Sequence, residues 1–437
     1  MDMQEWKQEF AGKRILIWGF GREGQSSYRL IRSLLPEQVI DIADSPRTGA
    51  AVLEKAHQQT VHAHIFYDTD IDITSYDMVL KSPGIVVPSG MSRDNLTGQT
   101  QLFLKHCRSQ VIGITGTKGK STTSTLTACI LSTKYRVHLV GNIGTPCFDI
   151  IPELQPEDLV SFETSCHQLE LCPYSPHVAV FLNLFEEHLD HYGTMAAYGA
   201  AKANVFLHQQ KGDIAILNED LTDWVSRADH PVLIGKDIRA EGRTLIIPGE
   251  SLTVDRCRLI GEHNYWNLAV VYYIAHAIYG VSNEAFLDAA ARFQPLEHRL
   301  EDLGIHGGIR YIDDSISTIG QSCIQALTSL KNVDTVLVGG MDRGIEYREL
   351  EAYLAARKDV QVIFMYASGH RVHAEMIAQG LDREGLHEVE DLEQAVALAK
   401  SLTRPGFSCL LSPAASSYDH FKNFEERGDV FERLAGR

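Results

Sequence analysis

Short runs of apolar residues, each closed by small or polar residues, recur along most of the chain. Residues 111–114 form such a run and end in a glycine-rich turn, after which residues 121–132 have helical composition. Near the amino end, residues 14–20 and 39–43 have the same character and enclose a helical segment through residues 26–34. Apolar strands that alternate with helical segments are typical of α/β proteins with parallel sheets.

The alternation continues along the rest of the chain. Further strands are expected at residues 78–80, 137–140, 159–163, 178–182, 311–312, 336–338, 362–365 and 409–411. Shorter strand-like runs at 232–234 and 244–247 predict a β-extension, and a long helix follows from Gly261 through His276. Because the composition changes again at 293–301, we expect three α/β domains, each built on a mainly parallel sheet: 1–97, 98–296 and 297–437.

Composition narrows the functional class. The net charge of −17 argues against nucleic acid or an anionic membrane as a partner. The longest apolar stretch, residues 268–281, is too short to cross a bilayer, so no membrane insertion is expected. The eight cysteines form no Cys-x-x-Cys pair, and we therefore expect reduced thiols in a cytoplasmic protein.

The glycine-rich turn after residues 111–114 has the layout of a phosphate-binding loop. It reads Gly116-x-x-Gly119-Lys120-Ser121, between a strand and a helix. Glycines allow several backbone N–H groups to converge on a phosphate, and the helix N-terminus adds partial positive charge. Lys120 would reach the terminal phosphates, and Ser121 or Thr122 would help to hold Mg²⁺. The spacing departs from the strict Walker pattern, so the alternative is a strand-to-helix turn with a chance Gly-Lys-Ser.

A second glycine cluster follows the first predicted strand. Gly19-x-Gly21-x-x-Gly24 precedes a helix, and Asp44 ends the next strand, where an acidic residue often contacts a ribose. On this feature alone an NAD-dependent dehydrogenase is an alternative, but no catalytic set for hydride transfer follows. The tripeptide Ser82-Pro83-Gly84 is, by pattern alone, a proline–glycine turn.

Polar residues also end several later strands, where a parallel sheet places its site. Glu163 closes one strand and His188 follows another, and both side chains could bind a metal ion. The neighbouring charges are expected to be solvated loop residues: Glu186, Glu187, Asp190 and His191. From the pattern alone, Lys202 is a surface lysine of a helix, whereas Asn264 or Asn267 reads a base edge or caps a helix.

Several ordered motifs together make the chain resemble the Mur ligase family. They are ITGTKGKST, NLFEEHLDHYG with AAKANVF, GEHNYWN, His298-Arg299 and LLSPAASSYDHFKNFEERG. The resemblance covers essentially all 437 residues, and it is strongest to the members that join D-glutamate to UDP-N-acetylmuramoyl-L-alanine. It implies a Rossmann-like UDP-binding domain, a central P-loop ATPase-like domain and a Rossmann-like domain for the amino acid. The implied reaction is ATP-dependent amide formation through an acyl phosphate, in cytoplasmic peptidoglycan precursor synthesis.

The resemblance also implies a set of site residues. Those expected to bind ATP are Gly116, Thr117, Lys118, Gly119, Lys120, Ser121, Thr122, Asn267, Arg299 and Asp314. Those expected to bind the UDP-sugar are Gly21, Arg22, Asp44, Ser45, Ser82, Pro83, Gly84, Asn142, Ser165 and Gln168. Those expected to bind glutamate are Thr318, Arg343, Ser417, Tyr418 and Phe424.

Metal and catalytic roles follow from the same resemblance. Two Mg²⁺ ions are expected, with ligands from Ser121, Thr122, Glu163, His188 and Lys202, the last as a carbamate formed with CO₂. An ammonium cannot bind Mg²⁺, whereas a carbamate offers an anionic oxygen. The expected catalytic residues are Lys120, Glu163, His188 and Lys202. The other partners are the small-molecule substrates, and we expect a monomer.

Two positions depart from the pattern of the D-glutamate enzymes. Ile316 stands where a lysine is usual, and Arg343 stands where a lysine is expected to hold the substrate carboxylate. Arginine keeps the positive charge but offers a planar, two-pronged contact. The alternatives are therefore ligation of L-glutamate to the same acceptor, or a catalytically silent homologue that binds the UDP-sugar or ATP.

Overall fold

The first sheet carries the amino-terminal glycine cluster at its carboxyl edge. The computed structural model describes residues 3–44, 63–67, 71–88 and 90–436. All strands of this sheet are parallel, in the order β3 (Ala63–Tyr67), β2 (Ile40–Asp44), β1 (Ile15–Trp18), β4 (Met78–Lys81) and β5 (Leu96–Thr97). Its helices are α1 (Met3–Phe10) and α2 (Arg22–Leu34). Helix α2 therefore begins directly at the glycine cluster, four residues before the predicted segment.

The central sheet is also entirely parallel. Its order is β11 (Val232–Ile234), β10 (Ile214–Asn218), β9 (Val178–Phe181), β6 (Val111–Thr115), β8 (Leu159–Glu163) and β7 (Val137–Gly141). Helix α5 (Lys120–Leu131) follows β6 and lies against β6, β7 and β8. The remaining helices of this region are α4 (Gln99–Cys107), α6 (Cys166–Leu169), α7 (Leu189–Tyr192), α8 (Met195–Ala203) and α9 (Thr222–Val225).

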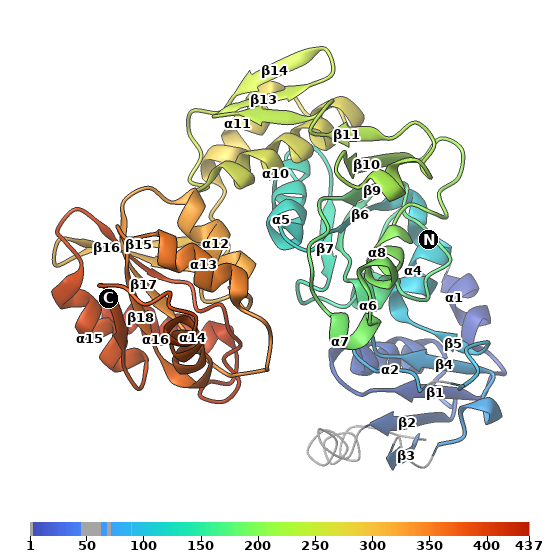
Figure 1. The fold of residues 1–437 in the computed structure, drawn as a ribbon. Helices are drawn as coiled ribbons and strands as arrows, with labels where there is room; N and C mark the ends of the chain where they lie inside the picture. The colour runs from blue at the N-terminus through green and yellow to red at the C-terminus, as the bar shows by residue number, and fades with distance from the viewer. Residues whose placement is uncertain (1–2, 45–62, 68–70, 89, 437) are drawn as a thin grey trace. The chain divides into compact units, whose positions relative to one another are not determined.

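Both runs of the predicted β-extension form strands, but the two strands belong to different sheets. Strand β13 (Thr244–Ile247) pairs antiparallel with β12 (Arg239–Glu241) and β14 (Glu250–Thr253) in a small separate sheet, which Figure 1 shows beside α11 (Asn283–Arg292). In contrast, β11 extends the edge of the central sheet by pairing with β10. A run of three apolar residues does not reveal its partner, because strand pairing is a tertiary choice.

The predicted long helix changes its hydrogen-bonding pattern before its end. Helix α10 (Glu262–Tyr272) passes into a π-helical segment, Tyr273–Ile278. Such widened turns are uncommon and arise where local packing favours them over regular α-helix. The prediction of one helix through His276 is therefore right in extent but not in type.

The last sheet is parallel apart from one edge. Its order is β15 (Glu301–His306), β16 (Ile309–Asp313), β20 (Ser408–Leu411), β17 (Val333–Val338), β18 (Gln361–Phe364) and β19 (Leu386–Glu388), with β15 antiparallel to β16. The helices are α12 (Gly320–Ser329), α13 (Arg348–Ala356), α14 (Tyr366–Ala378), α15 (Leu392–Leu402) and α16 (Phe424–Ala435). The expected α/β fold with three mainly parallel sheets is confirmed.

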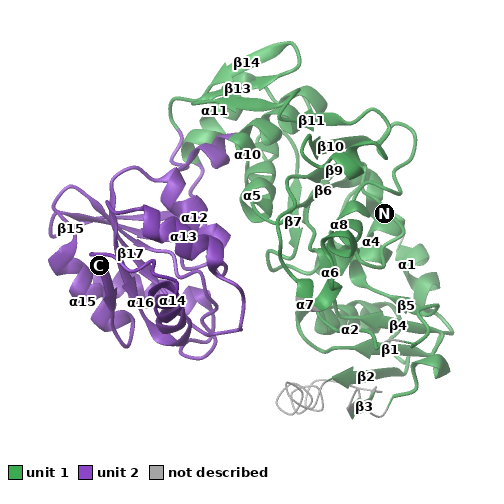
Figure 2. Ribbon diagram, in the orientation of Figure 1, with its two compact units in different colours: residues 1–256, 266–292 green, residues 257–265, 293–437 purple. Residues whose placement is uncertain are grey.

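The described chain divides into two compact units (Figure 2). One comprises residues 1–256 and 266–292 and holds the first two sheets, and the other comprises 257–265 and 293–437. A single cluster of buried side chains explains why the first two sheets form one unit, because it includes Phe10 and Ile17 beside the first sheet and Phe103, Phe148 and Phe162 from the central region. The predicted domain limits at 97/98 and 296/297 stay predictions.

All eight cysteines are free thiols in the structure. In the part of the chain that the structure describes, no helix has the length and apolar character needed to span a membrane.

Candidate functional site

The phosphate loop lies at the carboxyl end of β6, in the middle of the central sheet. Strands β9 and β8 flank β6, so the segments that follow these strands border the loop. Gly119 has a φ of 82°, and a Cβ there would lie 2.9 Å from Asn267 Oδ1. Both the backbone conformation and the close approach require glycine at this position. The same geometry puts Asn267, a predicted ATP residue, directly against the loop.

Two lysines converge on one carbonyl of this loop. Lys120 Nζ donates to the carbonyl oxygens of Gly116 at 3.0 Å and Thr117 at 2.9 Å, and Lys202 Nζ donates to Gly116 at 2.7 Å. Lys202 is only 1% exposed, so the pattern-based expectation of a surface lysine is wrong. Burial, and secondly the nearby charge of Lys120, lowers the pKa of Lys202 to about 7.

Tyr198 connects the predicted catalytic residues and was not predicted as a site residue. It is completely buried one turn before Lys202, whose Nζ lies 4.8 Å from the centre of the tyrosine ring. Its hydroxyl lies 3.3 Å from Thr117 Oγ1, and its ring centre lies 6.0 Å from that of His188. The spacing of four residues, which puts both side chains on one face of α8, was the available signal.

The segment after β9 is hydrogen-bonded to the phosphate loop. Asn183 Oδ1 accepts from the N–H of Lys118 at 2.8 Å, and the Thr117 hydroxyl accepts from the N–H of Phe185 at 2.9 Å. Lys118 Nζ also lies 3.4 Å from a Glu187 carboxylate oxygen. Burial raises the pKa of Glu187, but the charges of Lys118 and Lys120 together outweigh burial and hold this pKa below its usual value.

Glu187 and His191 were predicted to be solvated loop charges, but both side chains are mostly buried and form ion pairs. The Glu187 side chain is 19% exposed and the His191 side chain 11%, and His191 pairs with Glu170 at 3.0 Å. Glu186 is exposed, as expected. The side chain of Asp190 lies outside what the structure describes.

The carboxylate of Glu163, at the end of β8, is suited to bind a cation. Glu163 is 1% exposed; its Oε1 accepts from Asn142 Nδ2 at 2.8 Å, and among the described residues its Oε2 meets no hydrogen-bond donor. Burying a carboxylate oxygen without a partner is costly, and a hard cation such as Mg²⁺ would remove that cost. Ser121 and Thr122 open α5, where the family-based prediction places further metal ligands.

His188, another predicted metal ligand, is far more exposed than Glu163. Its side chain is 43% exposed, and its ring centre lies 4.9 Å from that of His167. Burial, and then the charges of His188 and His191, lowers the pKa of His167 to about 4, so His167 is neutral near pH 7. The metal-binding role of His188 stays a prediction.

A pocket of about 160 Å³ gathers residues predicted to bind the UDP-sugar from four separate parts of the chain. Its lining residues are Arg22, Glu23, Pro83, Gly141, Asn142, Gly144, Pro146, Ser165 and Gln168. Gln168 Oε1 accepts from the N–H of Ser165 at 3.0 Å, and Gln168 Nε2 donates to Glu23 at 2.8 Å. Glu23 was not predicted; burial raises its pKa.

The other predicted UDP residues meet at the edge of the first sheet. Asp44 Oδ2 accepts from the N–H of Phe20 at 2.9 Å, and the Ser82 hydroxyl donates to the carbonyl of Gly19 at 3.0 Å. These contacts tie the ends of β2 and β4 to the glycine cluster that contains Gly21 and Gly24. Gly84 follows in the same loop, and Ser45 lies outside the described residues.

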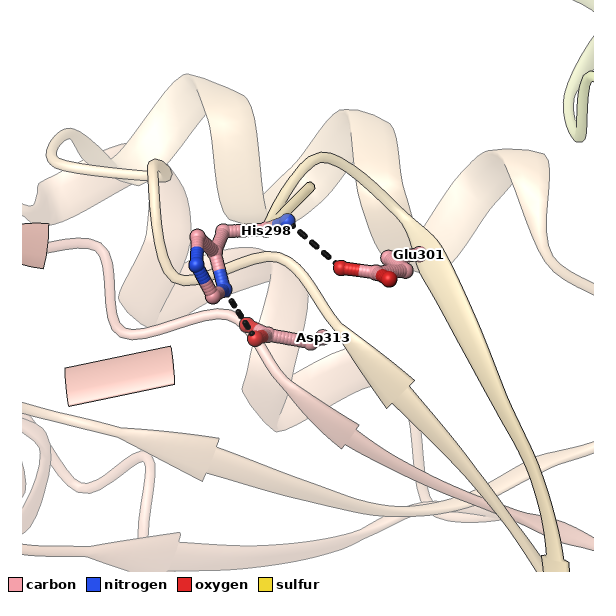
Figure 3. A group of neighbouring side chains, drawn as sticks. All are labelled: His298, Glu301 and Asp313. Carbon is pink, nitrogen blue, oxygen red and sulfur yellow. Dashed lines mark hydrogen bonds and ion pairs between the residues drawn. The ribbon is translucent and has the colours of Figure 1, made fainter. Parts of the chain in front are cut away.

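In the second unit, a buried ion pair flanks Arg299 (Figure 3). His298 Nδ1 lies 2.7 Å from Asp313 Oδ2, and the His298 main-chain N–H donates to Glu301 at 2.9 Å. His298 has a φ of 60°, so these bonds hold a strained turn just before Arg299. Burial raises the pKa of the next predicted ATP residue, Asp314, to about 7, although its carboxylate accepts from the Ser412 hydroxyl at 2.9 Å.

The predicted glutamate residues are also gathered in the second unit. Arg343 Nη2 donates to the carbonyl of Thr318 at 3.2 Å, and a β-bridge joins Met341 to Ser416, next to Ser417. Ser417 is buried. Two other predicted members are more open, because Tyr418 is 68% exposed and Phe424 is half-buried at the start of α16.

Comparisons with known proteins identify the family of this chain. Residues 114–275 match the Mur ligase middle domain. The UDP-N-acetylmuramoyl-L-alanine–L-glutamate ligase of Xanthomonas axonopodis pv. citri is 34% identical, over 98% of this chain and 96% of its own. The UDP-N-acetylmuramoylalanine–D-glutamate ligase of Pelotomaculum thermopropionicum is 31% identical, over 98% of each chain.

Among solved structures, the MurF ligase of Thermotoga maritima in complex with ADP has a TM-score of 0.60 at 18% identity, over 91% of this chain and 95% of its own. At that identity, the similarity supports a shared fold and nothing further. The full-length sequence relatives, together with the matched central domain, show the family: the chain belongs to the Mur ligases, which are ATP-dependent amino-acid ligases.

Proposed function

We propose that this protein joins glutamate to UDP-N-acetylmuramoyl-L-alanine at the cost of ATP, in cytoplasmic peptidoglycan precursor synthesis. The proposal rests on one contact above all. Asn142 lines the pocket of predicted UDP-sugar residues, and it also donates to Glu163 beside the phosphate loop. A carboxylate that extends from this pocket would therefore arrive next to the predicted phosphate and metal groups.

The reaction consists of two displacements. An oxygen of the acceptor carboxylate attacks the γ-phosphorus of ATP, the bond to ADP breaks, and an acyl phosphate forms. The amine of glutamate then attacks the acyl carbon, a C–N bond forms, phosphate leaves, and the nitrogen loses a proton. Because two anions must meet in the first step, charge neutralisation and positioning are the main requirements.

The residues of this chain meet those requirements in distinct ways. Lys120 and the N–H groups at the start of α5 neutralise and orient the transferred phosphoryl group. Ser121 or Thr122, and Glu163 with His188, would hold Mg²⁺, which would further neutralise the phosphate charge. Asn142, Ser165 and Gln168 orient the acceptor.

Lys202 is proposed to complete the metal site as a carbamate. Its pKa of about 7 leaves a substantial neutral fraction near pH 7, and a neutral amine is the form that attacks CO₂. A new N–C bond forms, and one proton is released. The product carries an anionic oxygen that can bind Mg²⁺, which an ammonium cannot do.

For the amino acid, we propose L-glutamate. The sequence motifs favoured D-glutamate, but relatives at 33–34% identity are named as L-glutamate ligases, against 30–31% for D-glutamate ligases. The departures at Ile316 and Arg343 are consistent with a different pocket. A silent homologue is disfavoured, because Lys120, Lys202 and the unpartnered Glu163 oxygen are all retained at the end of one sheet.

The test is ADP release by the purified protein with UDP-N-acetylmuramoyl-L-alanine and Mg²⁺, with the two glutamate isomers supplied separately. We expect turnover with L-glutamate at least about tenfold faster than with D-glutamate, because the isomers place the attacking amine differently. A preference for D-glutamate would overturn the stereochemical assignment. No turnover with either isomer would support the silent homologue.

A further inference from the structure

The loop of residues 339–347, which joins β17 to α13, carries Arg343 at the centre of a tight turn. Asp342 and Gly344 close this turn, because Asp342 Oδ1 accepts from the N–H of Gly344 at 2.9 Å. Gly344 has a φ of 68°, which favours glycine. The orientation of Arg343 therefore depends on where the Asp342 carboxylate is held.

Arg371, on α14, holds that carboxylate from outside the loop. Its Nε donates to Asp342 Oδ2 at 2.8 Å and its Nη2 to Oδ1 at 3.0 Å, which is a two-pronged contact. The same Nη2 donates to the carbonyl of Ile345 at 2.8 Å, and Nη1 donates to Glu375 at 2.8 Å. One guanidinium group thus binds the loop on both sides of Arg343, at Asp342 and at Ile345.

Two further contacts complete the support of the loop. The guanidinium of Arg371 lies 5.1 Å from the centre of the Tyr347 ring, and the Tyr347 hydroxyl donates to the carbonyl of Ala414 at 3.0 Å. Ser368, also on α14, exchanges hydrogen bonds with Gly340 at 2.8 and 3.0 Å. Helix α14 therefore fixes the start of the loop, its turn and its end.

We propose that Arg371 and Asp342 are positioning residues that set the recognition of the incoming amino acid's carboxylate by fixing Arg343. The inference rests on the proposed function and on the predicted role of Arg343 in binding the glutamate carboxylate. The physical reason is preorganisation. Without the Arg371–Asp342 contact, a loop with three glycines, Gly339, Gly340 and Gly344, would have to be ordered by the substrate itself, at a cost in affinity.

A merely structural role is the alternative, and the chain offers a matched control. Arg357 also makes a two-pronged contact, to Asp359 at 2.9 and 3.0 Å, and its guanidinium lies 5.8 Å from the ring of Tyr353. The exposed fractions of the two arginine side chains are nearly equal, 25% for Arg357 and 27% for Arg371. Arg357 supports α13 rather than the Arg343 loop.

The experiment compares Arg371→Gln, Asp342→Asn, Arg371→Lys and Arg357→Gln with the wild type in the full-length protein. KM is measured separately for glutamate, ATP and UDP-N-acetylmuramoyl-L-alanine. We expect the KM for glutamate to rise about 10- to 100-fold in Arg371→Gln, since small misplacements near a reacting centre cost up to about 100-fold. Asp342→Asn should act in the same direction, and Arg371→Lys should retain part of the wild-type affinity. In all of these, the KM for ATP and for the acceptor should stay within about twofold of wild type.

A second measurement separates positioning from misfolding. Isotope exchange between ADP and ATP, with the acceptor present and glutamate absent, reports only the first displacement, and it should be unchanged in every variant. An unchanged KM for glutamate in Arg371→Gln, an equal rise in Arg357→Gln, or a joint rise of all three KM values would overturn the inference. Failure of the wild type with both glutamate isomers would instead overturn the proposed function and the inference together.

Discussion

The phosphate-loop region and the Arg343 loop, both proposed here to bind anions, are built differently. Beside the phosphate loop, Glu163 at the end of β8 and Lys202 are each 1% exposed, and Lys202 donates to the backbone carbonyl of Gly116 in the loop. Around Arg343 the surfaces are open: Arg343 itself is exposed, and its supporting pair, Arg371 and Asp342, is 27% and 28% exposed. The first region is a fixed scaffold, and the second is a loop that other side chains hold in place.

This difference explains why the reaction class is easier to predict from the sequence than the preference for one glutamate isomer. Backbone N–H groups and the lysine of a glycine-rich turn bind phosphate in a recurring local arrangement, so a short motif is sufficient to recognise them. Carboxylate recognition by a surface arginine depends on the loop that carries it, and Arg371, which supports this loop, lies far from it in sequence and is not part of a short motif. The reaction class is therefore clearer than the stereochemistry.

The largest expected effect tests the fixed scaffold. Lys120→Ala should lower turnover by roughly 10³-fold or more, because the charge on the transferred phosphoryl group would lose its main neutralising side chain. Binding of UDP, measured calorimetrically, should stay within about twofold, since the predicted uridine residues lie at the edge of the first sheet. Near-normal ADP release by the variant would remove the phosphate loop from the mechanism.

Loss of Lys202 should be nearly as severe, and it should depend on pH in a defined direction. Lys202→Ala is expected to be almost inactive and to recover partly with formate, which can supply the missing carboxylate-like oxygen. In the wild type, the amine becomes neutral as the pH rises through about 7, so ¹³CO₂ incorporation at Lys202 should increase between pH 6 and pH 8. Full activity of the alanine variant without additives would show that no carbamate is needed.

An intermediate effect is expected at the Arg343 loop. Arg343→Ala should raise the KM for glutamate about 10- to 100-fold, as expected for the loss of one or two charge-assisted hydrogen bonds. Arg343→Lys keeps the charge but loses the planar contact, so its effect should be smaller. Steady-state kinetics with each glutamate isomer would show whether the planar contact also sets the preference between them. An unchanged KM in both variants would contradict a role of Arg343 in binding.

The smallest effect concerns the buried pair beside Arg299. Burial lowers the pKa of His298, but the hydrogen bond to Asp313 and the negative charges of Asp313, Glu301 and Asp429 together outweigh burial, so the folded pKa lies above the usual histidine value of about 6.5. The pair therefore stabilises the fold fully below about pH 6.5 and loses this contribution as the pH rises through the folded pKa. His298→Gln should lower the free energy of unfolding by roughly 1–3 kcal/mol at pH 5.5 and by less at pH 9. Denaturant titrations of the wild type and His298→Gln at pH 5.5 and pH 9 measure this difference. A larger loss of stability at pH 9 than at pH 5.5 would contradict the prediction.

The sequence determined the elements that depend on local composition. Strands β6 and β8, the start of α5 and the residues of the phosphate loop follow directly from apolar runs that end in glycine or in Glu163. The Mur family, and hence the list of site residues, came from motifs far apart along the chain. None of this required knowledge of which strands are neighbours.

Only the tertiary structure decided the surroundings of individual groups. It placed β11 at the edge of the central sheet and β13 in a separate small sheet, and it buried Lys202 beside Lys120. It also brought in Tyr198, Glu23 and Arg371, for which no motif was recognised. The physical reason is that burial, the pKa of a lysine and the support of a loop are set by neighbours distant in sequence. Local pattern carries no information about those neighbours until the strands are paired.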